Sequence, residues 1–257
     1  MKWLIVSLVV GLVVGCISAF FLSSLHFISD WRESHLWIIA GLPMGGLLIG
    51  LLYHHYGDRS SRGNNLLIDE IHQPSHRIPL RMAPLVLFST LLTHLLGGSA
   101  GREGTAVQIG GAISDQLSKS KYFSAEDRKI LICIGISAGF ASVFGTPIAG
   151  AIFALEVLTI GRIRYEAILP CFLTAIIADY SCRFWEIPHT HYGIASIPEL
   201  TPEIFLWTIL VGVLFGLVAK SFAQLNRFWS ELFRKSVKYP PLRPLLGGIV
   251  IALAVWL

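Results

Sequence analysis

Long apolar runs alternate with short polar segments along the whole chain. The apolar runs cover about residues 3–27, 36–53, 80–97, 104–117, 130–142, 146–160, 165–185, 204–223 and 242–257. The first run is long enough to cross a bilayer with some tilt, whereas several others are shorter than the roughly 20 residues of a full crossing and contain glycine or proline. A broken helix cannot leave backbone N–H and C=O groups facing lipid, so its broken part must be buried in protein or line a cavity. The pattern therefore predicts an all-α integral membrane protein with broken and re-entrant helices.

Composition supports a membrane location. Of 257 residues, 54% are hydrophobic and 14% are charged, whereas globular proteins average about 25% charged residues. The net charge of +4 is modest, and loop Lys and Arg residues that follow the positive-inside rule explain it better than nucleic-acid binding does. We expect polar loops at about residues 54–79, 118–129 and 186–203, and arginines near both ends of the first suggest a cytoplasmic face. We predict a multi-pass protein of the cell (inner) membrane with no nucleic-acid partner.

Two segments of the chain, about 200 residues apart, are similar in sequence. LVVGLVVGCISAFF (8–21) is similar to ILVGVLFGLVAKSF (209–222), and Gly11 and Gly15 fall 201 positions before Gly212 and Gly216. Small residues four apart are common on packed membrane helices, but downstream a second similarity, PMGG against PLLGG, follows in the same order. Two matched helices in succession indicate a structural repeat.

This repeat predicts the domain organisation. Residues 1–200 would form a first membrane repeat, and residues 201–257 would begin a second repeat that is incomplete. The chain stops inside an apolar run at Leu257, so we expect a truncated product or fragment.

The segment Gly98–Thr105 (GSAGREGT) places Arg102 and Glu103 between two uncharged apolar flanks. A charge at membrane depth costs about 2.5–3.5 kcal/mol on insertion scales, so its presence indicates a function. We expect the glycines to let the backbone bend and to leave N–H groups open at the start of a new helix, where anions bind readily. These glycines are Gly98, Gly101 and Gly104. The segment predicts an anion pathway that contains a glutamate.

Three stretches together resemble the signature regions of the CLC chloride channel and transporter family. They are GNNLLIDEIH (63–72), GSAGREGTAVQIGG (98–111) and AGFASVFGTPIAGAIFALEV (138–157). The resemblance implies a CLC-type inverted-repeat helical bundle, of which residues 1–257 would be the first half and the opening of the second. It also implies a homodimer with one pore in each subunit, with helices near 138–185 supplying part of the contact.

The same resemblance implies the roles of individual residues. Glu103 would be the gating glutamate and proton carrier, because it stands at the glutamate of the GREG motif. The transported halide anion would bind at the following residues: Asn64, Asn65, Gly101, Arg102, Gly104 and Thr105.

Three departures from the chloride members bear on the branch of the family: two indicate the fluoride branch, and the third agrees with that branch or with a channel. GNNL, with Asn64 at the position of a chloride-coordinating serine, and GREGT resemble the bacterial fluoride/proton antiporters. An amide offers N–H donors to a small, strongly hydrated anion. Val157 follows Glu156 where many chloride/proton exchangers have a second glutamate. We predict fluoride export by fluoride/proton antiport; the alternative is a chloride channel or a chloride/proton exchanger.

Two other functions remain as alternatives with weaker support from the sequence. Residues 97–101 match G-x-S-x-G, so an intramembrane serine hydrolase with Ser99 and, as base, His94 or another histidine is an alternative, although that motif needs a strand–turn–helix context. A non-transporting fragment that packs against a partner chain is another. We expect no enzymatic activity, because small residues at a helix break match this motif by chance, and no cofactor. We also expect no metal site: the histidines suggest a metal only weakly, and Pro74 breaks any helix that would place His72 and His76 on one face.

Overall fold

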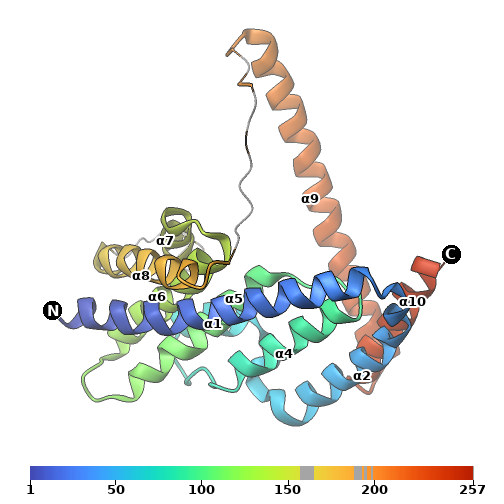
Figure 1. Cartoon of the computed structure of the whole chain (residues 1–257), viewed down its shortest axis with the longest axis horizontal. Helices are drawn as coiled ribbons and strands as arrows, with labels where there is room; N and C mark the ends of the chain where they lie inside the picture. The colour runs from blue at the N-terminus through green and yellow to red at the C-terminus, as the bar shows by residue number, and fades with distance from the viewer. Residues whose placement is uncertain (157–164, 188–192, 194–195, 198, 257) are drawn as a thin grey trace.

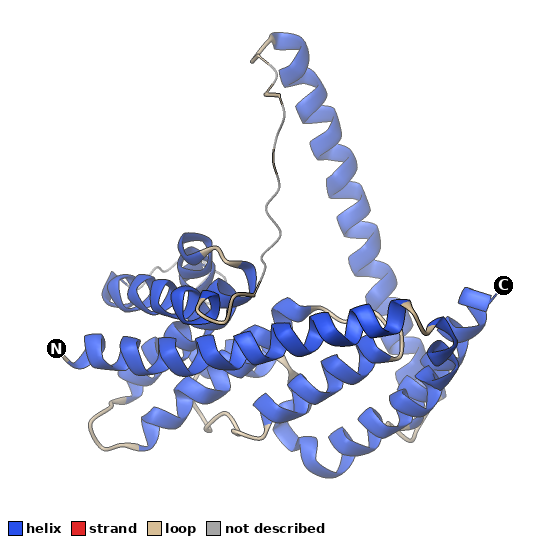
Figure 2. Ribbon diagram, viewed as in Figure 1, coloured by secondary structure: helices blue, strands red, loops and turns tan. Residues whose placement is uncertain are grey.

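The computed structural model of the chain describes residues 1–156, 165–187, 193, 196–197 and 199–256. Within these ranges all regular secondary structure is helical and no strand occurs (Figure 2). The α-helices are α1 (Lys2–Glu33), α2 (Leu42–Leu52), α3 (Asn64–His72), α4 (Met82–Leu95), α5 (Arg102–Ser114), α6 (Ala125–Phe144), α7 (Pro147–Glu156), α8 (Tyr165–Arg183), α9 (Pro202–Ser236) and α10 (Leu242–Trp256). Short 3₁₀ or π turns add η1 (Leu36–Gly41), η2 (Tyr53–Gly57), η3 (Asp58–Arg62) and η4 (Asp115–Lys119).

The all-α membrane fold predicted from the apolar pattern is confirmed. Among the described residues, four helical stretches are long and apolar enough to cross a membrane: Lys2–Glu33, Leu36–His72, Tyr165–Arg183 and Pro202–Ser236. The apolar helices α4, α7 and α10 are shorter than 18 residues. The chain thus combines full-length helices with short ones.

One predicted loop is wrong. The segment 54–79, predicted as a polar loop, contains η3 and the nine-residue helix α3. Leu66, Leu67 and Ile71 are buried on one face of α3, whereas its first two residues are exposed. An amphipathic helix of this length has no continuous apolar run, so a search for such runs misses it.

Helix α6 forms the centre of the bundle, with α1, α5, α7 and α8 packed around it. Fourteen of its 20 residues are buried. Helix α1 lies along α8, and α9 extends away from the bundle (Figure 1). No residue of α9 is buried.

Helices α5 and α6 cross at a point where both helices carry glycine. A Cβ on Gly110 of α5 would overlap the carbonyl oxygen of Gly135 of α6, and a Cβ on Gly139 would overlap that of Ala106. Small residues four apart let membrane helices approach until their backbones touch. This close crossing fixes the position of α5, whose N-terminus carries Glu103.

Gly110→Ala should therefore destabilise the protein by about 1–3 kcal/mol, because the added methyl group forces two backbones apart. Unfolding in detergent, followed by circular dichroism, measures the change. Gly212→Ala on α9 is the matched control: a Cβ there meets nothing within 4 Å, so the substitution should be neutral or raise helix stability by up to about 1 kcal/mol. Equal effects of the two substitutions would contradict the close crossing.

Helices α2 and α10, the pair matched by the PMGG and PLLGG segments, pack against each other (Figure 1). A Cβ on Gly46 of α2 would overlap the backbone of Pro244 of α10, and a Cβ on Gly248 would lie 2.8 Å from the Cα of Pro43. Each helix thus presents a glycine to a proline of the other.

Candidate functional site

Helix α4 ends in a turn that directs the chain toward α5. The N–H of Gly98 bonds the carbonyl of Thr93 at 2.9 Å, and the N–H of Gly97 bonds that of His94 at 3.1 Å. This is the Schellman arrangement, which needs a left-handed residue, and Gly97 has a φ of +78°. The bend expected at Gly98, Gly101 and Gly104 is thus made by Gly97, because among the glycines of the described segment 97–104 it alone has a positive φ.

Helix α5 begins next to the side chain of Glu103. Its N-cap, Gly101, is extended and no side chain caps the helix, so the first N–H groups have no partner within the helix. The Oε2 atom of Glu103 lies 2.7 Å from the position that a Cβ on Gly101 would take. The carboxylate therefore folds back over the positive N-terminus, and Gly101 supplies the space that it occupies.

The N-terminus of α3 meets this first turn of α5. Its N-cap, Gly63, has a φ of +56°, and no side chain caps α3 either. The Nδ2 atom of Asn64 lies 3.4 Å from the position of a Cβ on Gly104. Asn64, Gly101, Glu103 and Gly104 are therefore brought together where two positive helix ends converge, an arrangement that attracts an anion.

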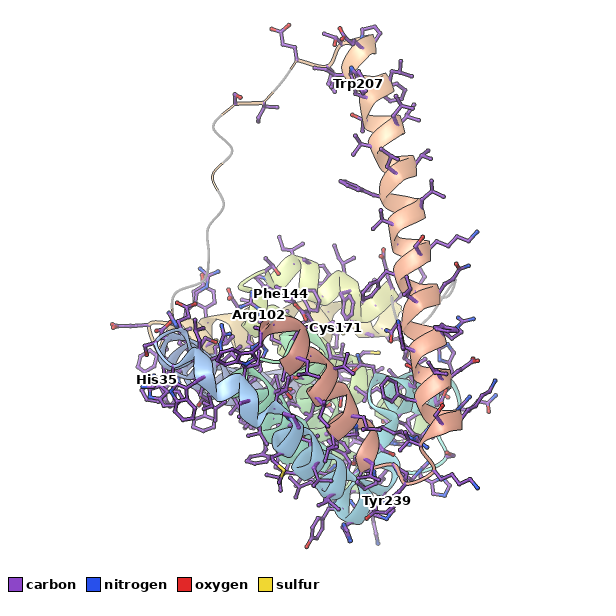
Figure 3. All side chains as sticks on the ribbon, turned by 90° about the vertical axis from the view of Figure 1, so that its right-hand side faces the viewer. His35, Arg102, Phe144, Cys171, Trp207 and Tyr239 are labelled. Carbon is purple, nitrogen blue, oxygen red and sulfur yellow. The ribbon has the colours of Figure 1, made fainter. Side chains whose placement is uncertain are left out.

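Three other residues predicted to bind the anion lie differently. Asn65 is exposed on the first turn of α3, as Asn64 is, but it is not among the residues nearest to Gly104. The guanidinium of Arg102 lies over the ring of Phe144, with its Cζ 5.8 Å from the ring centroid (Figure 3). Thr105 is 2% exposed, and its hydroxyl bonds Thr90 of α4 at 2.6 Å and the carbonyl of Gly101 at 3.2 Å. The Thr105 side chain therefore fastens the start of α5 to α4.

Gln108, one turn after Gly104, is a residue of this junction that the sequence analysis missed. Its Nε2 atom lies 3.5 Å from the Cβ position on Gly63 and 3.8 Å from that on Gly104. The sequence could have indicated this position, because Gly104 and Gln108 are four residues apart and residues i and i+4 of a helix share a face.

A buried ion cluster of Glu70, Asp115 and Arg128, also missed, holds α3 from its other end. Glu70 accepts hydrogen bonds from the N–H groups of Ser75 and His76 and from Arg128, whose Nη1 lies 3.1 Å away. Arg128 also donates from Nε to Asp115 at 2.6 Å. The side chains of Glu70, Asp115 and Arg128 are 1%, 0% and 10% exposed. The cluster ties the segment after α3 to the end of α5 and the start of α6.

The hydrolase alternative lacks its expected geometry. The Nε2 atom of His94 lies 2.9 Å from the carbonyl oxygen of Ala100, and within the described part of the chain no hydrogen bond joins His94 to Ser99. Ser99 follows the end of a helix rather than a strand. Val157, on which one argument for the fluoride branch rests, lies outside the described residues.

Comparisons with known proteins give a consistent result. The family described as voltage gated chloride channel matches residues 45–257. A chloride/fluoride channel protein of Pseudomonas syringae pv. tomato is 49% identical over 99% of this chain and 56% of its own length. The H(+)/Cl(-) exchange transporter ClcA of Vibrio cholerae is 28% identical over 96% of this chain and 56% of its own length.

The fold has a close counterpart among solved structures. The crystal structure of a CLC-type fluoride/proton antiporter matches 98% of this chain and 64% of its own, with a TM-score of 0.92 and 38% identity. The chain spans a little over half the length of the curated relatives that it matches.

Proposed function

The chain belongs to the voltage-gated chloride channel family, and from this premise we propose that it carries fluoride outward across the membrane in exchange for protons. The observation that carries the proposal is the first turn of α5, where the Glu103 carboxylate lies beside Gly101 and the Asn64 amide of α3 lies beside Gly104. The names of two similar proteins, a chloride/fluoride channel protein and a fluoride/proton antiporter, support fluoride as the anion.

Glu103 is proposed as both gate and proton carrier. Its carboxylate occupies the positive N-terminus of α5, the place that an incoming anion needs. A halide can replace the ionised carboxylate there, and a protonated Glu103 no longer competes for the site. Fluoride enters cells from acid as neutral HF, so an exporter that takes protons in exchange suits this ion.

Asn64 is proposed to set the preference for fluoride over chloride. Its carboxamide offers two N–H donors, whereas a serine offers a single O–H donor. Fluoride is the more strongly hydrated ion, so it loses more when a donor is removed. Asn64→Ser should lower the ratio of fluoride to chloride efflux from liposomes by about tenfold, the effect of losing one hydrogen bond to a charged group.

The same assay separates the alternatives. Liposomes that contain the purified chain are loaded with fluoride or chloride, and ion release is followed with electrodes while the external pH is recorded. Fluoride release with proton uptake supports antiport. Chloride release at an equal rate, or an unchanged ratio in Asn64→Ser, would favour the chloride alternative.

We further propose that the protein works as a homodimer in the inner membrane, with residues 1–200 as a first repeat and 201–257 as the opening of a second. The large exposed side chains of Leu169, Ile176 and Tyr180 support a subunit contact on α8, since their spacing places them on one face. The pairing of α2 with α10 supports the repeat.

A further inference from the structure

We propose that a groove at the start of α4 binds an anionic phospholipid of the surrounding membrane, with an acyl chain along its apolar wall and the phosphate on Arg81. The groove has a volume of about 400 Å³ and lies between the end of α2 and the start of α4, two helices that contact each other (Figure 1). Its lining consists of Leu52, Tyr56, Arg81, Pro84, Leu85 and Phe88. Such a lipid site would exist whichever ion the protein carries.

The wall that α4 contributes is apolar except at its first residue. Pro84, Leu85 and Phe88 follow Arg81 by three, four and seven residues, a spacing that places them on one face of the helix. A rise of 1.5 Å per residue puts Phe88 about 10 Å from Arg81 along the helix axis. Phe88 and Tyr56 are 45% and 62% exposed. A phospholipid has the same arrangement, a charged phosphate joined to an apolar chain, and arginine and tyrosine commonly lie at the level of lipid headgroups.

Arg81 has hydrogen-bond donors available for a phosphate. Its Nη2 atom donates to Asp58 at 2.8 Å, and among the described residues its guanidinium makes no further hydrogen bond. The side chain is about half exposed. A guanidinium has five N–H donors in one plane and often binds two phosphate oxygens at once, so Arg81 can keep Asp58 and still bind a phosphate. Arg77, in the segment before α4, is also exposed and has no carboxylate partner within the described ranges.

A strongly basic turn lies next to the groove. The ring centroids of Tyr239, in the turn between α9 and α10, and of His54, in η2, are 5.4 Å apart (Figure 3). A Cβ on Gly50 of α2 would lie 2.8 Å from the Cα of Pro241 in the same turn. Residues 232–257 contain no acidic residue and four basic ones: Arg234, Lys235, Lys238 and Arg243. Basic side chains near a membrane surface attract anionic lipids, so the groove should prefer a lipid with a net negative charge.

Native mass spectrometry of the purified chain in detergent tests the proposal, with phosphatidylglycerol as the anionic probe and phosphatidylcholine as the zwitterionic one. The wild type should bind one phosphatidylglycerol more tightly than it binds phosphatidylcholine. Arg81→Met should weaken that binding about tenfold, the effect of losing a hydrogen bond between charged groups. The variant should fold, because both side chains of the Arg81–Asp58 pair are exposed.

Arg62→Met is the matched control. Arg62 pairs with Asp69, its side chain is 49% exposed as that of Arg81 is, and it does not line the groove. The substitution removes the same charge, so phosphatidylglycerol should bind as it does to the wild type. Glycerophosphoglycerol, the headgroup without acyl chains, tests the apolar wall and should bind only at much higher concentration.

Four results would overturn the proposal. Unchanged binding in Arg81→Met would remove Arg81 from the site, and equal losses in Arg81→Met and Arg62→Met would reduce the effect to net charge. Equal binding of phosphatidylcholine or of the bare headgroup would show that the groove does not select an anionic phospholipid. Binding of phosphatidylglycerol to the monomer but never to a dimer would assign the groove to a second copy of the chain. Each of these results leaves the proposed fluoride/proton exchange standing.

Discussion

Replacing Glu103 by glutamine should abolish the proton uptake that accompanies fluoride efflux. Glutamine keeps the shape of the side chain, but it can neither bind a proton nor place a negative charge over the α5 N-terminus, where the Glu103 carboxylate lies. A helix end that carries about half a positive charge then has no competitor for the incoming anion. We expect the external pH signal to fall to the level of protein-free liposomes, with any remaining fluoride movement uncoupled from protons.

The control for this experiment is Glu33→Gln, the same chemical change at the exposed end of α1. It should leave fluoride release and proton uptake unchanged. Proton uptake that persists in Glu103→Gln would remove Glu103 from the proton pathway. A wild-type chain that releases no fluoride would contradict antiport by this chain as a whole.

Arg128→Met should lower the free energy of unfolding by about 3–5 kcal/mol, more than Gly110→Ala or Arg81→Met. The Arg128 guanidinium contacts the buried carboxylates of Asp115 and Glu70 at 2.6 and 3.1 Å. Methionine leaves these carboxylates without their main partner in a region that excludes water. Denaturant unfolding in detergent, followed by circular dichroism, measures the change.

Arg81→Met provides the comparison, because Arg81 pairs with Asp58 at 2.8 Å and both side chains are about half exposed or more. Exposed pairs contribute between about 0 and 1 kcal/mol, so this variant should unfold almost as the wild type does. If the two variants lose the same stability, the Glu70–Asp115–Arg128 cluster does not support the fold in the way that its burial implies.

The long helices and the helix start at the GREG motif could be predicted from the sequence because the signals are local. The apolar runs at 3–27 and 165–185 correspond to α1 and α8, and the GREG motif lies at the start of a helix as expected. Each of these predictions depends on residues that are neighbours in the chain. The roles of Glu103 and Asn64 in transport stay predictions.

The remainder of the site depends on distant contacts. Glu70 and Arg128 are 58 residues apart in the chain, and nothing in either local pattern indicates that they meet. Gln108 looks like an ordinary polar residue on an otherwise apolar helix until α3 is placed beside it. The glycine pattern predicts backbone freedom, whereas in the structure Gly101 and Gly104 supply room for the Glu103 and Asn64 side chains.

The pairing of α2 with α10 bears on the order in which the chain can assemble during synthesis. Gly46 contacts Pro244, so its partner emerges from the ribosome 198 residues later. At about 5–20 residues per second, this delay is roughly 10–40 s. During that interval the glycine face of α2 has no α10 to cover it, and it is open to lipid, to the insertion machinery or to another nascent chain. Slowing translation between α8 and α10 should therefore lower the yield of folded protein without altering the protein once it has formed.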